Sequence, residues 1–254
     1  ECIYSIKNMP KENYRIFICD NRKVKGENKL FDEYKKYVVG SGVVDCLKKI
    51  CSQTNSEYVQ ILTAGDRVSI DWGYEIEKND KFDVIISSQI YRGTNGEFIY
   101  NLSSDGVFEN ENAIDDILKF YFLSGGEDRY VREIDNKAFS REIILKALDN
   151  IQNTTNIFVI WEIVLNALLL SRKIIFAKNS YVSYDLTNDR KIFAQDSKRT
   201  LLDASEFLDA IKNKAPIELR QKADIWIDDW LRNLIRRLEA YHTDHNVIKE
   251  NVKE

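Results

Sequence analysis

Short runs of β-branched and aromatic residues alternate with segments of helical periodicity between residue 14 and about residue 90. Three such runs, at 14–19, 58–62 and 83–87, read as strands, and each ends in small or polar residues. Between the first two, apolar residues recur at helical spacing over 43–51, which predicts a crossover helix. This alternation predicts an α/β fold, a mostly parallel sheet flanked by helices.

Polar residues stand directly after the first two predicted strands. Asp20 and Asn21 follow the first, and Thr63-Ala-Gly-Asp66 follows the second. Ligands of parallel sheets bind beyond the carboxyl ends of the strands, so we expect both segments to border one crevice. Two alternatives stay open, because Asp20 could instead close an Asx turn and residues 64–66 could form a simple turn.

The rest of the chain reads as mainly helical. Helices are predicted at about 114–122, from Ser140 onward with its hydroxyl as the cap, and at about 157–170. From about residue 200 the chain is helical and charged, with an apolar stripe of Ile225, Trp226, Trp230, Leu231, Leu234 and Leu238. Such a stripe either packs on its own domain or, with Arg232, Arg236 and Arg237 beside it, contacts an anionic membrane surface.

Charge and cysteine content exclude several classes of protein. The 37 Lys and Arg against 41 Asp and Glu give a net charge of −4, which disfavours generic nucleic-acid binding. No apolar run approaches the roughly 20 residues of a bilayer-spanning helix. The four cysteines lack paired spacing and lie in apolar runs, which predicts buried reduced thiols and therefore a cytoplasmic protein. Contact with the inner face of the membrane through the C-terminal helix stays open as an alternative.

The order of these pieces carries a resemblance to a known family. A strand ending at Asp20-Asn21, a crossover helix, the segment Glu57–Asp66 and later Asn136-Lys-Ala-Phe-Ser-Arg-Glu-Ile-Ile144 together resemble family 2 glycosyltransferases of the GT-A fold. The resemblance covers roughly residues 1–185. It implies a GT-A-like domain over 1–198, with a nucleotide half at about 1–90 and an acceptor half at about 91–198, followed by a helical extension over 199–254. It also implies that the family's first strand lies upstream of Glu1.

The resemblance assigns nucleotide binding to Asp20, Asn21, Thr63 and Asp66. The family's DxD carboxylates hold a divalent cation on the donor diphosphate, but Thr63 and Gly65 occupy two of these positions, so Asp66 is the one carboxylate left for a metal. A Mn²⁺ or Mg²⁺ cofactor is therefore not indicated, although one carboxylate with diphosphate and water can still hold Mg²⁺. Alternatively, Arg67 or basic residues of the loops neutralise the diphosphate.

The acceptor side is implied by two later segments. Lys137 matches the family's Lys before an Arg-Glu pair, and Trp161 and Glu162 stand where the family carries Glu-Asp at a helix start. The resemblance makes Glu162 the catalytic base, and the alternative is an ordinary surface glutamate.

The resemblance implies a bacterial-type, hexosyltransferase-like glycosyltransferase of polysaccharide biosynthesis. It would move a sugar with inversion from a nucleotide-sugar, a UDP-sugar being the expected donor, to a glycan, a lipid-linked acceptor or a protein. Replacement of the metal carboxylates keeps a second reading open, a catalytically impaired GT-A-like binding or assembly module of a larger protein. A third reading is an α/β domain with no shared ancestry.

Overall fold

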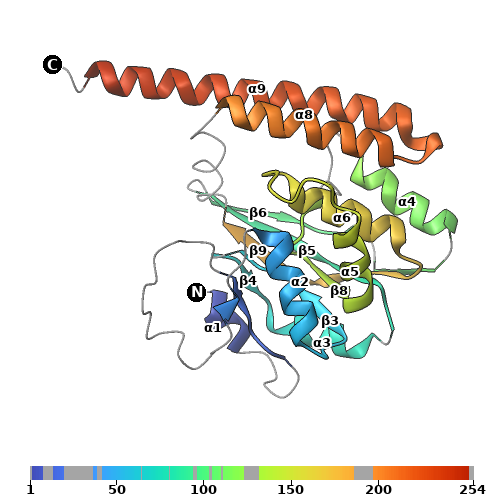
Figure 1. Ribbon diagram of the computed structural model, residues 1–254. Helices are drawn as coiled ribbons and strands as arrows, with labels where there is room; N and C mark the ends of the chain where they lie inside the picture. Colours follow the sequence, from blue (N-terminus) through green and yellow to red (C-terminus); the bar gives the residue numbers. More distant parts are fainter. Residues whose placement is uncertain are drawn as a thin grey trace.

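A computed structural model describes residues 2–7, 14–19, 37–38, 42–63, 65–79, 81–93, 96–102, 105–109, 111–122, 132–185 and 197–251. A curled sheet lies in the middle of the molecule, and two long C-terminal helices cross above it (Figure 1). The predicted nucleotide-binding residues Asp20 and Asn21 lie outside the described residues.

Seven of the described strands form one sheet. Its main path runs β3 (Tyr58–Gln60), β8 (Lys137–Ser140), β5 (Val84–Gly93), β9 (Ile174–Asp185) and β4 (Arg67–Val68). In addition, β6 (Gly96–Tyr100) pairs with β5, and β7 (Gly106–Phe108) pairs with β9. A separate parallel pair joins β1 (Ile18–Cys19) to β2 (Tyr37–Val38).

The predicted α/β class is confirmed, but the prediction of a mostly parallel sheet is wrong for the described strands. Within the large sheet β5 and β9 pair in parallel, while β8, β6, β4 and β7 each run antiparallel to their neighbours. The reason is that β5 turns back through β6 as a hairpin, and β8 inserts in reverse between β3 and β5. The predicted strands β3 and β5 still point the same way, so their carboxyl ends lie toward one edge.

The predicted helices form near their expected bounds. The elements are α1 (Cys2–Lys7), α2 (Val43–Gln53), α3 (Ile70–Lys78), α4 (Glu111–Tyr121), α5 (Arg141–Asp149), α6 (Val159–Leu170), α8 (Ser197–Lys214), the 3₁₀ turn η3 (Ile217–Leu219) and α9 (Arg220–Asn251). Ser140 caps α5 as predicted, because its Oγ accepts a hydrogen bond of 3.3 Å from the Ile143 N–H.

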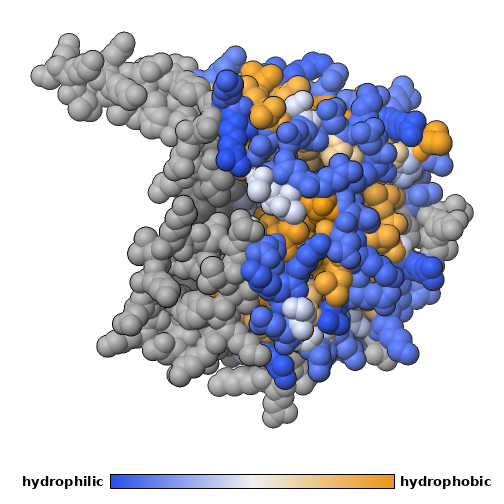
Figure 2. Space-filling view, in the orientation of Figure 1, coloured by the Kyte–Doolittle hydropathy of each residue, from blue (hydrophilic) through white to orange (hydrophobic). Residues whose placement is uncertain are grey.

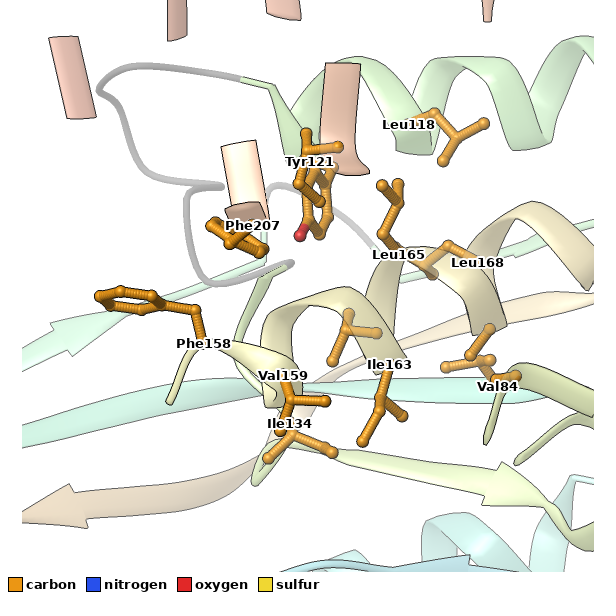
Figure 3. Packing of buried hydrophobic residues seen from close by; sticks show 14 of the residues in the cluster. Val84, Leu118, Tyr121, Ile134, Phe158, Val159, Ile163, Leu165, Leu168 and Phe207 are labelled. Atoms are coloured by element: carbon orange, nitrogen blue, oxygen red, sulfur yellow. The ribbon is translucent and has the colours of Figure 1, made fainter. Parts of the chain in front are cut away.

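The central helix α6 packs between the sheet and a second helical layer. Figure 3 shows Val159 and Ile163 on one side of α6, near Ile134. On another side, Leu165 and Leu168 lie toward α4. All four of these α6 side chains are buried, and α6 is apolar around most of its circumference because neighbours cover both sides.

The C-terminal helices share this core. Phe207 of α8 and Trp226 of α9 are buried in the same cluster as Val84 of β5. Trp226, Leu234 and Leu238 of the predicted stripe are buried, and Trp230 and Leu231 pack partly buried against the cluster, whereas Ile225 is 55% exposed. The stripe therefore packs on its own domain, one of the two predicted outcomes. On the face seen in Figure 2, hydrophilic residues cover most of the described surface and hydrophobic residues show in separate groups.

Two further predictions concern the membrane and the thiols. Among the described helices, none combines the length and the apolar character needed to cross a bilayer. None of the four cysteines forms a disulfide, but the prediction that they are buried holds for Cys46 and Cys51 only, since Cys2 is half-buried and Cys19 is exposed. Cys19 belongs to β1, which pairs with β2 outside the large sheet, so the main core does not cover it.

Candidate functional site

The segment after β3 forms a tight turn around Asp66. The Asp66 N–H donates to the Thr63 carbonyl at 3.0 Å, and the Thr63 N–H donates to Asp66 Oδ2 at 2.6 Å. Gly65 has a φ of 111°, a conformation that glycine adopts readily and other residues avoid. Asp66 itself is only 1% exposed. Hydrogen bonds therefore join Thr63 and Asp66, the two predicted nucleotide-binding residues of this segment. Their backbone forms the turn that the sequence analysis gave as an alternative.

The geometry of this turn agrees with the absence of carboxylates at positions 63 and 65. A carboxylate at position 65 would need a side chain where the backbone has a positive φ, which is costly for residues other than glycine. Position 63 offers a hydroxyl, and one oxygen of Asp66 already accepts a backbone hydrogen bond. Across the residues that the structure describes, no three His, Cys, Asp or Glu side chains gather as metal ligands. These three positions do not by themselves fit a divalent cation.

The N-terminal helix packs against the same turn. Ser5 Oγ of α1 accepts a hydrogen bond of 3.2 Å from the Val68 N–H of β4, directly after Asp66. The thiol of Cys2 is close enough to feel the Asp66 charge. The pKa of this thiol is raised to about 11. Burial is the larger cause, and the negative charge of Asp66 is the smaller one. Helix α1 thus helps to shield Asp66 from water.

Asp66 belongs to a mostly buried polar cluster, whose other members are Glu133, Asp135 and Lys137. It forms because β8 runs antiparallel to β3, so that the residues entering β8 lie at the edge where β3 ends. Asp135 and Lys137 are 2% and 0% exposed, whereas Glu133 is half-buried. Near the carboxyl end of β3, where ligands of α/β sheets bind, two further acidic side chains and one basic side chain therefore lie within electrostatic range of Asp135.

Two glutamines from the strands hold Asp135 in place. Gln89 of β5 donates to Asp135 Oδ2 at 2.7 Å, and Gln60 of β3 donates to the Asp135 carbonyl at 3.1 Å. Each glutamine accepts a further hydrogen bond, Gln60 from the Trp72 indole at 2.8 Å and Gln89 from the Tyr91 hydroxyl at 2.9 Å. These hydrogen bonds connect β3, β5 and α3 to the segment before β8, and they hold Asp135 in a fixed position.

The cluster perturbs its own ionisation. Burial raises the pKa of the Asp135 carboxyl well above its usual range, and the nearby charges of Glu133 and Asp66 raise it further. Burial lowers the pKa of Lys137 to about 7, although Asp135 and Glu133 favour its charged form. The Lys137 ammonium donates to the Glu133 carbonyl and, at 2.7 Å, to Asn136 Oδ1. Perturbed groups of this kind gather at functional sites more often than elsewhere.

The two predicted site residues of helix α6, Trp161 and Glu162, point in different directions. The Trp161 indole N–H donates to Glu133 Oε2 at 3.4 Å, so Trp161 contacts the polar cluster. The Glu162 carboxylate pairs instead with Lys214 of α8, and Glu162 is 5% exposed. Successive residues of a helix point about 100° apart, which explains the split. The surface alternative for Glu162 is wrong because Glu162 is buried, while its predicted role as base is a prediction that needs an assay.

The structure thus joins four of the predicted site residues and leaves one apart. Asp66 with Thr63, Lys137 and Trp161 all contact or border the polar cluster, whereas Glu162 faces α8. The sequence analysis missed Glu133 and Asp135. A signal for them existed, because both directly precede the Asn136-Lys137 motif, and Gln60 and Gln89 stand in apolar strands where a buried amide needs a partner.

Comparisons with known proteins agree with this architecture. No family model and no curated protein matches the chain. Among solved structures, S. aureus TarS residues 1–349 matches with a TM-score of 0.55 and 11% identity, over 96% of this chain and 87% of that chain. The same protein in complex with UDP-GlcNAc matches with a TM-score of 0.52, and in complex with UDP with 0.53, each at 11% identity and the same coverage. The chain has the GT-A-like fold of these structures.

Proposed function

We propose that this protein is a glycosyltransferase that moves a sugar from a nucleotide-sugar, with a UDP-sugar as donor, to an acceptor hydroxyl. The observation that carries the proposal is the buried polar cluster at the carboxyl end of β3 in a GT-A-like fold. Structures with this fold have been solved with UDP and UDP-GlcNAc, which supports these molecules as the first ligands to test. A glycan, a lipid-linked saccharide or a protein as acceptor, and inversion at the sugar carbon, belong to the same proposal.

The chemistry asks the protein to hold the donor and to accept a proton. In a single displacement, the acceptor oxygen bonds to the anomeric carbon while the bond from that carbon to the diphosphate breaks and the nucleotide leaves with the electron pair. The proton of the acceptor hydroxyl passes to a carboxylate of the protein. A divalent cation, when bound, would stabilise the charge of the leaving diphosphate.

The first test measures nucleotide binding and turnover together. Thermal unfolding and calorimetric titration with UDP and UDP-GlcNAc, each with and without Mn²⁺, report binding and its dependence on metal. Release of UDP from UDP-GlcNAc and from other UDP-sugars, and release of GDP from GDP-mannose, followed by mass spectrometry, report turnover with water as acceptor. We expect binding of UDP and slow release of UDP from at least one donor. Absence of release from every donor would refute the proposed function, whether or not UDP binds.

One observation favours a second function, a GT-A-like binding or assembly module that has lost catalysis. Asp66 uses an oxygen to close its own turn, and Glu162 is paired with Lys214, so two residues that the resemblance assigns to chemistry have structural partners. The same experiment separates the two functions, because the module binds nucleotide without releasing it from any donor.

A further inference from the structure

The polar cluster contains one carboxylate that is open to solvent as well as held in place. Asp66 and Asp135 are 1% and 2% exposed, whereas Glu133 is half-buried. A general base must reach the hydroxyl from which it takes a proton, so accessibility separates Glu133 from the other two. In addition, burial raises the pKa of Asp135, and Asp135 Oδ2 already accepts a hydrogen bond from Gln89.

Glu133 lies beside the first turn of α6 although it belongs to a different segment of the chain. Its Oε2 accepts the indole N–H of Trp161 at 3.4 Å, and Trp161 is the third residue of that helix. The first turn of α6 is where the family resemblance implies a catalytic carboxylate. Glu162, the carboxylate on the helix itself, faces α8 and pairs with Lys214. The contact with Trp161 therefore places the Glu133 carboxylate beside the first turn of α6.

The backbone around Glu133 is anchored on both sides. On one side, the Arg132 guanidinium donates to the Tyr121 carbonyl at 2.9 Å and lies 5.2 Å above the Trp226 ring. On the other side, Asn136 Nδ2 donates to the Ser87 carbonyl at 3.0 Å, and the Ser87 N–H donates back to the Asn136 carbonyl at 2.9 Å. The Glu133 carbonyl itself accepts the Lys137 ammonium. Such anchoring fixes a carboxylate in one orientation before substrate arrives.

We propose that Glu133 is the catalytic base of the transfer, an inference that rests on the proposed function. The Glu133 carboxylate takes the proton of the acceptor hydroxyl as the acceptor oxygen forms its bond to the anomeric carbon of the donor. The bond from that carbon to the diphosphate oxygen breaks, and the nucleoside diphosphate leaves with the electron pair. The protonated Glu133 then returns its proton to water. Trp161 acts as a positioning residue, since its N–H orients the carboxylate.

The test compares three glutamate-to-glutamine variants of the full chain. Glu133→Gln removes the proposed base, Glu162→Gln removes the base predicted from the resemblance, and Glu142→Gln is the matched control, because the Glu142 side chain is 76% exposed on α5. Release of UDP from the donor that the unchanged protein turns over gives kcat and KM, calorimetry gives the dissociation constant of UDP, and thermal unfolding checks the fold. Glu133→Ala also removes the carboxylate and serves as the second variant if the amide disturbs folding.

We expect Glu133→Gln to lower kcat by about 100-fold or more with the affinity for UDP unchanged, which is the usual contribution of a general base. Glu142→Gln should keep kcat. Trp161→Phe should lower kcat and leave the KM of the donor unchanged, whereas a purely structural role would lower the unfolding temperature without this split. A kcat of Glu133→Gln or of a folded Glu133→Ala within about twofold of the unchanged protein would overturn the proposal while the proposed function stands. Absence of turnover in the unchanged protein itself would overturn both.

Discussion

The buried ion pair between Glu162 and Lys214 gives a prediction that separates stability from catalysis. The pair joins α6 to α8, with side-chain exposures of 6% for Glu162 and 22% for Lys214, and Lys214 also donates to the Asn150 carbonyl at 3.3 Å. If this pair is structural, removal of either partner should lower the free energy of unfolding and leave release of UDP unchanged.

The expected magnitude follows from what each variant leaves behind. Lys214→Met keeps the length of the side chain but leaves the Glu162 carboxylate buried without its cation, which costs about 3–5 kcal/mol. Glu162→Gln leaves Lys214, which is closer to the surface and can turn toward water, so the loss is closer to that of one charged hydrogen bond, about 1.5–3 kcal/mol. For a chain of this length about 1 kcal/mol lowers the unfolding temperature by roughly 2–4 °C.

The assay is a double-mutant cycle. Urea unfolding of Lys214→Met, Glu162→Gln and the double variant gives the coupling energy, and we expect the double variant to be more stable than the sum of the single losses predicts. Release of UDP is measured on the same samples. A coupling energy below about 0.5 kcal/mol, or a loss of kcat of about 100-fold in Glu162→Gln at unchanged stability, would refute the structural role and return Glu162 to the position of catalytic base.

Two further predictions concern Lys137 and Trp226. The pKa of Lys137 is about 7 in the folded protein against 10.5 for the ordinary side chain, so between these values the unfolded chain binds more protons and the free energy of unfolding should rise with pH. Lys137→Met should flatten this rise in urea unfolding at pH 7, 8.5 and 10, and an equal slope in both proteins would contradict the burial of a titrating lysine. Trp226 is 2% exposed, so Trp226→Ala should cost about 3–5 kcal/mol, whereas Ile225→Ala, at a 55% exposed neighbour, should cost less than about 0.5 kcal/mol. A similar small loss for both variants would show that the C-terminal helices do not share the core.

The local elements of this fold could be predicted because each rests on residues close together in sequence. The spacing of apolar residues predicted α2, Ser140 predicted the start of α5, and the run at 58–62 predicted β3. The stripe around Trp226 likewise predicted a helix with one buried face. In these cases the hydrogen bonds and the periodicity are local, so no knowledge of the partner element was needed.

Strand order could not be predicted in the same way. The prediction of a mostly parallel sheet failed because β8 pairs with strands some 80 (β3) and some 50 (β5) positions earlier in the chain and runs against both. Nothing in four residues of a buried strand encodes its direction relative to a distant neighbour, since both directions satisfy the same backbone groups. That reversal also decided the site, because it brings Asp135 and Lys137 to the end of β3.

By itself, the sequence determined the α/β class and the positions of most helices, since these depend on periodicity and capping, whereas the turn around Asp66 was one of two open alternatives. Tertiary structure alone decided which carboxylates share one site. Glu162 stands on the predicted helix, but its side chain pairs with Lys214 some 50 residues later, while Asp135 lies within range of the charges of Asp66 and Glu133. Charges act through space and over short distances, so their partners are chosen by packing rather than by order along the chain.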